Sequence, residues 1–219
     1  SCDRLWRFVA ARQDIFVRRV IRRQAPPWTD DAVLARCFIT NVYRELDRGT
    51  RYLLTEILPQ WPRSETRLWN VILYRWFNRI PTYEALAPWH DPRRWEPKAV
   101  LRKLRQVQKQ GPVFSGAYQF TTGGRRGEKI ALYVRWLSAV RRQIPTLLPA
   151  LRQAPTMADA HALLCEHLPG VGGFVAYELL TDCTYRNGPG HIPLVPFTEN
   201  EWAHIGPGAM RGLQRLWQP

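Results

Sequence analysis

Hydrophobic residues recur at helical spacing along most of the chain. In residues 4–24, apolar side chains such as Leu5 and Phe8 recur on one predicted helix face and arginines face away from them. Pro26 and Pro27 end the segment. The same spacing predicts further helices over residues 29–47, 64–79, 97–110 and 128–143. The only strand-like or irregular segment is 111–127, and a Gly- and Pro-rich stretch follows Asp182. The pattern therefore predicts an all-α fold in one compact unit with two lobes.

A short turn between two more predicted helices organises the rest of the chain. Leu168-Pro169-Gly170-Val171-Gly172 follows a helix that starts at the N-cap Thr156, and it precedes a short helix over residues 174–180. Glycines allow the backbone to approach a phosphate closely, and a helix N-terminus offers free N–H groups to it. The pattern over residues 156–182 resembles a helix-hairpin-helix, which clamps the DNA backbone. The predicted DNA contacts are Gly170, Val171, Gly172 and Gly173. The alternative is an ordinary glycine-capped helix end followed by a new helix.

The predicted helix over residues 64–79 is apolar almost all round, so it should be buried. Asn70, Tyr74 and Asn78 nevertheless line up on it at intervals of four residues. Because buried amides need hydrogen-bond partners, these side chains line either a substrate pocket or an internal hydrogen-bond network. The sequence leaves both interpretations open.

The predicted helix over residues 29–47 and the residues just after it carry polar side chains at three- and four-residue spacing. Asn41, Arg44, Glu45 and Arg48 would share one helix face, with Asp47 beside Arg44 on the next turn. On the sequence alone, a solvated face with ordinary ion pairs is favoured over a functional site.

Composition adds a partner to this picture. The 219 residues include 32 Lys and Arg against 18 Asp and Glu, a formal charge of +14 in a chain that is 45% hydrophobic. These values indicate a folded, basic protein, and nucleic acid is the first expected partner. A basic protein of another function is the alternative. No apolar run reaches membrane-spanning length, so no membrane partner is expected. Most of the ten tryptophans and eight tyrosines should be core residues, although a few could stack on an extruded base.

The cysteines do not indicate a metal site. Cys2, Cys37, Cys165 and Cys183 show no paired spacing, although His161 lies one helical turn before Cys165. Buried thiols and a surface histidine are favoured over a metal centre, so no metal ligand is predicted. Reduced cysteines fit a cytosolic protein.

Five blocks of sequence resemble the α-glutamyl/putrescinyl thymine pyrophosphorylase family. They follow the order of that family between residues 38 and 212: Asn41-x-x-Arg44-x-x-Asp47-x-x-Thr50; Asn70-x-x-x-Tyr74-Arg75-x-Phe77-Asn78; Phe114-Ser115-Gly116-Ala117-Tyr118; Gly170 to Glu178 with Asp182; and Gly206-Pro207-Gly208-Ala209-x-Arg211-Gly212. The resemblance implies a fold like that of the helix-hairpin-helix DNA glycosylases, with two helical lobes around a cleft in a single domain, residues 1–219.

The resemblance also implies an activity, since the family includes bacteriophage amino acid:DNA transferases. The chain would transfer an amino acid or amine onto the 5-methylene of pyrophosphorylated 5-hydroxymethyluracil in DNA and displace pyrophosphate. The implied partners are double-stranded DNA with a modified thymine and an amino acid or polyamine. The implied setting is the cytoplasm of an infected bacterial host, and the expected state is a monomer. No resident cofactor is expected with certainty, and a divalent ion on the pyrophosphate stays open.

The resemblance selects the site residues, and their roles follow from the chemistry. A base must remove a proton from the amine, and we expect Asp47 or Asp182 to do so. Arg44 and Arg75 are expected on pyrophosphate or on a substrate carboxylate. The remaining substrate contacts are expected from amides on the base edge or amino acid (Asn41, Asn70 and Asn78) and from aromatic side chains (Tyr74, Phe77 and Tyr177).

Two rival functions remain at this level. A DNA glycosylase would release a free base, but such enzymes place a catalytic Asp beyond the helix that follows the hairpin. Here Asp182 lies only ten residues past Gly172 and no Asp follows it, so Asp182 would need unusual reach or Glu199 would have to substitute. This departure favours transfer over glycosidic cleavage. A non-catalytic hairpin module would bind DNA but would have little reason to keep Asn70, Tyr74 and Asn78 in an apolar helix.

Overall fold

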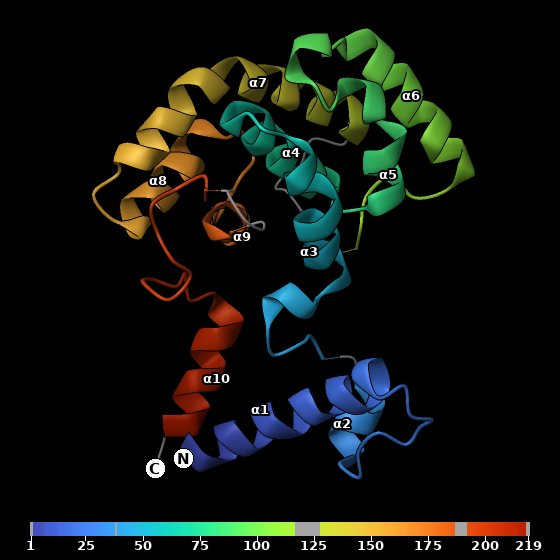
Figure 1. The fold of residues 1–219 in the computed structure, drawn as a ribbon, viewed down its shortest axis with the longest axis vertical. Helices are drawn as coiled ribbons and strands as arrows, with labels where there is room; N and C mark the ends of the chain where they lie inside the picture. The colour runs from blue at the N-terminus through green and yellow to red at the C-terminus, as the bar shows by residue number, and fades with distance from the viewer. Residues whose placement is uncertain (1, 38, 117–127, 187–191, 218–219) are drawn as a thin grey trace. The chain divides into compact units, whose positions relative to one another are not determined.

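The computed structural model describes residues 2–37, 39–116, 128–186 and 192–217. Its described residues are helical or irregular, without strands, which confirms the predicted all-α class (Figure 1). The chain forms two compact units, residues 1–51 with 205–219 and residues 52–204. The likeness to a glycosylase domain stays a prediction.

Three of the described α-helices, α1, α2 and α10, lie entirely in the smaller unit. Helix α1 (Cys2–Phe16) continues into a π-helical turn at Val17–Ile21, close to the predicted helix over residues 4–24. Helix α2 (Ala32–Arg36) is short, and α10 (Pro207–Trp217) lies in a stretch for which the sequence predicted no helix.

The predicted helix over residues 29–47 is wrong beyond its first turn. Asp31 caps α2, but α2 ends at Arg36, and residues 44–46 form a single 3-10 turn before α3 (Arg48–Tyr52). Arg12 donates to the carbonyl oxygen of Ile39 and, at 2.8 Å, to Oδ1 of Asn41. Nδ2 of Asn41 in turn donates to Oδ1 of Asp47 at 2.9 Å. These side-chain bonds compete with helical ones, so Asn41, Arg44 and Arg48 do not share a helix face.

Helix α4 (Ser64–Phe77) is the centre of the larger unit. It packs against α5 (Ile80–Ala85), α7 (Lys129–Gln153) and α9 (Gly173–Thr184) (Figure 1). Helix α6 (Pro97–Gln110) packs on α5 and α7, and α8 (Met157–His167) packs on α7 and α9. Every residue of α4 from 67 to 77 is buried, as its apolar circumference predicts. Asn78 ends the helix in the left-handed conformation, with φ 46°.

Helix α7 is longer than the predicted helix over residues 128–143. The prediction that the helix ends before the prolines is wrong. It runs to Gln153 through Pro145 and Pro149. A proline inside a helix removes a hydrogen bond and crowds the preceding turn. Four buried apolar side chains anchor this half of the helix and offset that cost: Ile144, Leu147, Leu148 and Leu151.

Helices α8 and α9 stand on either side of the predicted turn. Oγ1 of Thr156 accepts from the backbone N–H of Asp159 at 3.1 Å and caps α8, as expected. Gly170 has φ 75°, and Gly172 is the extended N-cap of α9. Helix α9 continues to Thr184, past the predicted end. The role of the α8–α9 turn as a clamp on DNA stays a prediction.

Candidate functional site

Arg75 and Asp182 form a buried ion pair between α4 and α9. Nε of Arg75 lies 2.6 Å from Oδ2 of Asp182, and a terminal guanidinium nitrogen lies 3.0 Å from Oδ1. The two side chains are 2% and 0% exposed. The third guanidinium nitrogen donates to Oδ1 of Asn78 at 3.0 Å. The structure therefore brings together three of the predicted site residues.

Asn70 belongs to a different, fully internal network. Its Nδ2 donates at 2.8 Å to the carbonyl oxygens of Thr66 and His90, and its Oδ1 accepts from the Tyr83 hydroxyl at 2.8 Å. The ring of Tyr83 stacks on His90, with centroids 3.8 Å apart. These hydrogen bonds match the internal network that was one of the two interpretations of the Asn70 spacing, and a contact of Asn70 with substrate stays a prediction.

The predicted stacking residues are packed against protein aromatics. Tyr74 lies against Tyr83 with ring centroids 5.6 Å apart, and Phe77 stacks on Phe114 at 5.6 Å. Both Tyr74 and Phe77 are 1% exposed. Tyr177 is half-buried and meets Trp202 edge to face. In this arrangement Tyr177 is the most accessible of the three.

Asn41 and Asp47 lie in the smaller unit, with Arg12 as their partner. The Arg12 pKa is lowered by burial, and the nearby Asp47 carboxylate opposes that shift. Arg44 is half-buried at the start of the 3-10 turn. The smaller unit thus holds one cluster of predicted residues and the larger unit holds the other. Phe38, and Ala117 and Tyr118 of the third block, lie outside the described residues.

The two predicted bases stand in different environments. Both oxygens of Asp182 accept from Arg75, and the carboxylate is 1% exposed. Asp47 is only half-buried, and its Oδ1 accepts a hydrogen bond from Asn41. A general base must reach the proton that it removes. This geometry favours a structural role for Asp182 and leaves Asp47 as the more accessible candidate.

The three glycines around the start of α9 differ in their surroundings. A Cβ atom at Gly170 would lie 2.5 Å from the Trp136 ring, and one at Gly173 would lie 2.7 Å from the His204 ring. A Cβ atom at Gly172 would have nothing within 4 Å. Among the predicted DNA contacts, Gly172 is therefore the position open to an approaching phosphate. Val171 is 7% exposed and belongs to the core.

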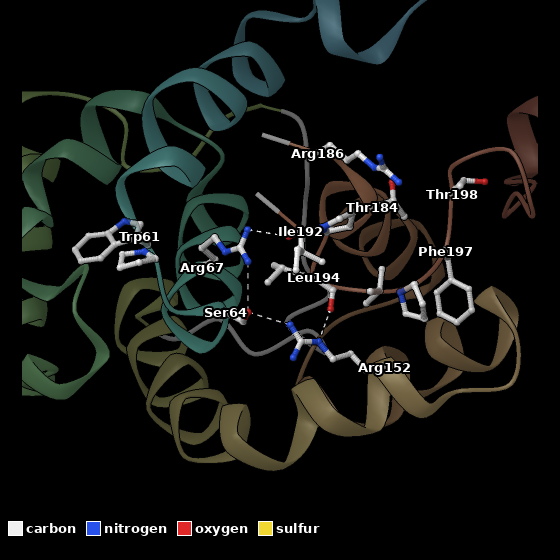
Figure 2. A pocket seen from close by; sticks show the side chains of 14 residues that line it. Trp61, Ser64, Arg67, Arg152, Thr184, Arg186, Ile192, Leu194, Phe197 and Thr198 are labelled. Atoms are coloured by element: carbon white, nitrogen blue, oxygen red, sulfur yellow. Dashed lines mark hydrogen bonds between the residues drawn. The ribbon is translucent and has the colours of Figure 1, made fainter. Parts of the chain in front are cut away.

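The larger unit also contains a cavity of about 720 Å³ that sequence reasoning missed. Figure 2 shows three arginines around it, Arg67 from α4, Arg152 from α7 and Arg186 just after α9. The lining also includes Ile192, Leu194 and Phe197. One signal was available in the sequence. Arg67 is a cation in a helix that the hydrophobic pattern predicts to be buried.

Within the described residues, no group of three His, Cys, Asp or Glu side chains could hold a metal ion. His161 lies 4.0 Å from the Cys165 sulfur, and its Nε2 lies 2.8 Å from the carbonyl oxygen of Gly173. Of the helices in the described ranges, none has the length and apolar character needed to cross a membrane.

The described part of the chain thus combines an all-helical fold, a buried Arg75–Asp182 ion pair and an arginine-lined cavity. The chain belongs to the family described as 5-hmdU DNA kinase, helical domain, which matches residues 1–219. A 5-hmdU DNA kinase of Bacillus phage SP10 is 28% identical over 222 residues, which cover 94% of this chain and 34% of that relative. The chain therefore spans about a third of the length of that protein. No solved structure matches.

These matches agree with the family resemblance at its coarser level, a phage family of thymine modification. They name a DNA kinase, and they do not name the pyrophosphorylase and transferase subfamily. The finer assignment is taken up below.

Proposed function

We propose that this chain is a helical DNA-binding domain that recognises 5-hmdU in DNA and takes part in modifying its 5-hydroxymethyl group. The observation that carries the proposal is the family match across residues 1–219, together with the relative named as a 5-hmdU DNA kinase. The formal charge of +14 supports a polyanionic partner.

The start of α9 supports a role in contacting the DNA backbone. A Cβ atom added at Gly172 would meet no other atom within 4 Å, and the first N–H groups of α9 follow this residue. Such groups favour a phosphate oxygen, and the helix dipole adds to the attraction. In this proposal the α8–α9 turn fixes the register of the domain on the duplex, and other residues read the modified base.

The phosphoryl transfer of the relative is proposed to lie in the two thirds of that protein that the match leaves uncovered. This chain has no Gly-x-x-x-x-Gly-Lys-Ser/Thr sequence, the loop that cradles nucleotide phosphates in one large class of kinases. The matched helical part would then hold the DNA while another part supplies the phosphoryl donor.

A nuclease footprint tests the proposal. The chain is bound to a duplex of about 30 base pairs with one central 5-hmdU, and to the same duplex with thymine in its place. On the 5-hmdU duplex, we expect a protected segment centred on the modified base. On the thymine duplex, we expect protection to be spread evenly along the DNA. Identical protection of both duplexes would contradict recognition of the modified base.

Transfer of an amine with displacement of pyrophosphate is a second candidate. The arginine-lined cavity favours it, because guanidinium groups suit a departing pyrophosphate. DNA carrying 5-pyrophosphomethyl-uracil is incubated with amino acids and polyamines, digested, and its nucleosides are analysed by mass. An aminated nucleoside, released one-for-one with pyrophosphate, would establish this candidate. Unchanged nucleosides would leave recognition of 5-hmdU as the only proposed role. Abasic DNA would contradict both candidate functions.

A further inference from the structure

The cavity in the larger unit carries positive charge without a matching negative charge. It is formed where α4 begins, where α7 ends, and where the chain continues past α9 (Figure 2). None of its described lining residues is acidic. Arg67, Arg152 and Arg186 have no ion pair with any carboxylate in the described parts of the chain.

Arg67 is the most unusual of these cations, since it is only 6% exposed. Its two terminal nitrogens donate to neutral acceptors, the carbonyl oxygen of Ile192 at 3.0 Å and Oγ of Ser64 at 3.3 Å. Its Nε is buried and has no partner among the described residues. A buried cation is costly unless it is paired. Burial lowers the Arg67 pKa, and the charge of Arg152 lowers it further.

Arg152 meets Arg67 at one hydroxyl group. Its Nε donates to the carbonyl oxygen of Leu194 at 3.0 Å, and a terminal nitrogen donates to Oγ of Ser64 at 2.9 Å. Ser64 thus accepts from both guanidinium groups, which Figure 2 shows as two dashed lines to its side chain. Two like charges held at one acceptor repel each other, and an anion between them would relieve the repulsion.

We propose that this cavity binds a phosphoryl group, with Arg67, Arg152 and Arg186 as its cationic wall. Guanidinium forks match the geometry of phosphate oxygens. The apolar side chains of Trp61, Leu194 and Phe197 line the rest of the cavity, so the phosphoryl group is attached to an organic moiety of nucleotide size. The naming of a nucleotide rests on the proposed function, whereas the phosphoryl site rests on the arginines alone.

Calorimetric titration tests the site with three probes: inorganic pyrophosphate, thymidine 5′-monophosphate and a short unmodified duplex. Arg152→Gln and Arg186→Gln remove exposed cavity charges and should leave the fold intact. Whichever probe binds in the cavity, each substitution is expected to weaken its binding about tenfold, the effect of losing one charged hydrogen bond. Arg142→Gln is the matched control, because Arg142 is an exposed arginine on α7 that does not line the cavity. It should bind as wild type does.

The three probes separate the sources of the phosphoryl group. Weakening with the monophosphate places a nucleotide in the cavity, weakening with pyrophosphate alone places a free anion there, and weakening with the duplex alone places the DNA backbone there. Failure of all three probes to bind, or equal binding by Arg152→Gln, Arg186→Gln and wild type, would overturn the site. Duplex binding that survives in every variant, together with unchanged binding of both small probes, would overturn the cavity site while leaving the proposed DNA-binding function in place.

Discussion

Asp182 accepts two hydrogen bonds from Arg75 across the α4–α9 contact, at 2.6 and 3.0 Å, in a region that solvent does not reach. Arg75 also holds Asn78, whose Nδ2 donates to Oγ of Ser115 at 3.4 Å. The pair therefore links α9 to the end of α4 and to the loop that follows α6. Removal of one partner would leave the other buried charge without this ion pair.

We expect Asp182→Asn to lower the free energy of unfolding by about 3–5 kcal/mol, the cost of breaking a buried pair from one side. Urea unfolding measures this loss. The matched control is Asp47→Asn, because Asp47 is half-buried and lies in the smaller unit. A stable Asp182→Asn protein that lost only activity would instead identify Asp182 as a general base.

Gly170 and Gly172 should respond differently to substitution. At Gly170, alanine would be strained by φ 75° and would collide with Trp136, so we expect Gly170→Ala to cost about 1–3 kcal/mol of stability. Gly172→Leu should leave the unfolding free energy within about 0.5 kcal/mol of wild type, because a side chain there points into open space.

DNA affinity then tests the clamp separately from the fold. If a phosphate lies against Gly172, the Gly172→Leu protein should bind every duplex more weakly, whatever its sequence, in a filter-binding or anisotropy assay. Full affinity in this folded variant would show that the turn does not contact the backbone.

How far the sequence predicts this structure depends on whether local or distant residues decide each element. Helices α4 and α6 and the cap at Thr156 follow from periodicity and neighbouring side chains, and they were predictable. The conformation of residues 39–47 was not, because Arg12 reaches Ile39 and Asn41 from α1 and its hydrogen bonds compete with helical ones. The prolines of α7 misled for a similar reason, since the packing that offsets them comes from other helices.

The candidate site shows the same division. The spacing of Asn70 indicated a buried amide, but its partners Tyr83 and His90 lie 13 and 20 residues away and no pattern connects them. The pairing of Arg75 with Asp182 spans 107 residues. The cavity depends on a segment after α9 that returns to α4 and α7, so only the unusual position of Arg67 could have pointed to it.

His90 should make stability depend on pH. Its Nε2 lies 2.8 Å from the carbonyl oxygen of Tyr83, to which it must donate, and burial lowers the pKa of the ring. A histidine with a lowered pKa takes up its proton more readily in the unfolded chain. Its contribution to stability is therefore complete above the unfolded pKa of about 6.5 and is lost as the pH falls below that value.

Thermal or urea unfolding of wild type and His90→Gln between pH 7.5 and 5.5 measures this effect. The wild type should lose up to about 1.4 kcal/mol per pH unit more steeply than the variant below about pH 6.5. Parallel pH profiles would show that His90 does not titrate on unfolding.

If this helical domain recognises 5-hmdU in DNA, equilibrium binding should distinguish a duplex that carries the modified base from one that does not. The Kd is measured by anisotropy at several salt concentrations for two duplexes that differ only by 5-hmdU or thymine at one position. The affinity for both duplexes should fall steeply with salt, by a slope of about 0.9 per phosphate contacted. Binding to the 5-hmdU duplex should be at least about fivefold tighter, the effect of one added hydrogen bond. Equal affinity for the two duplexes at every salt concentration would contradict recognition of 5-hmdU.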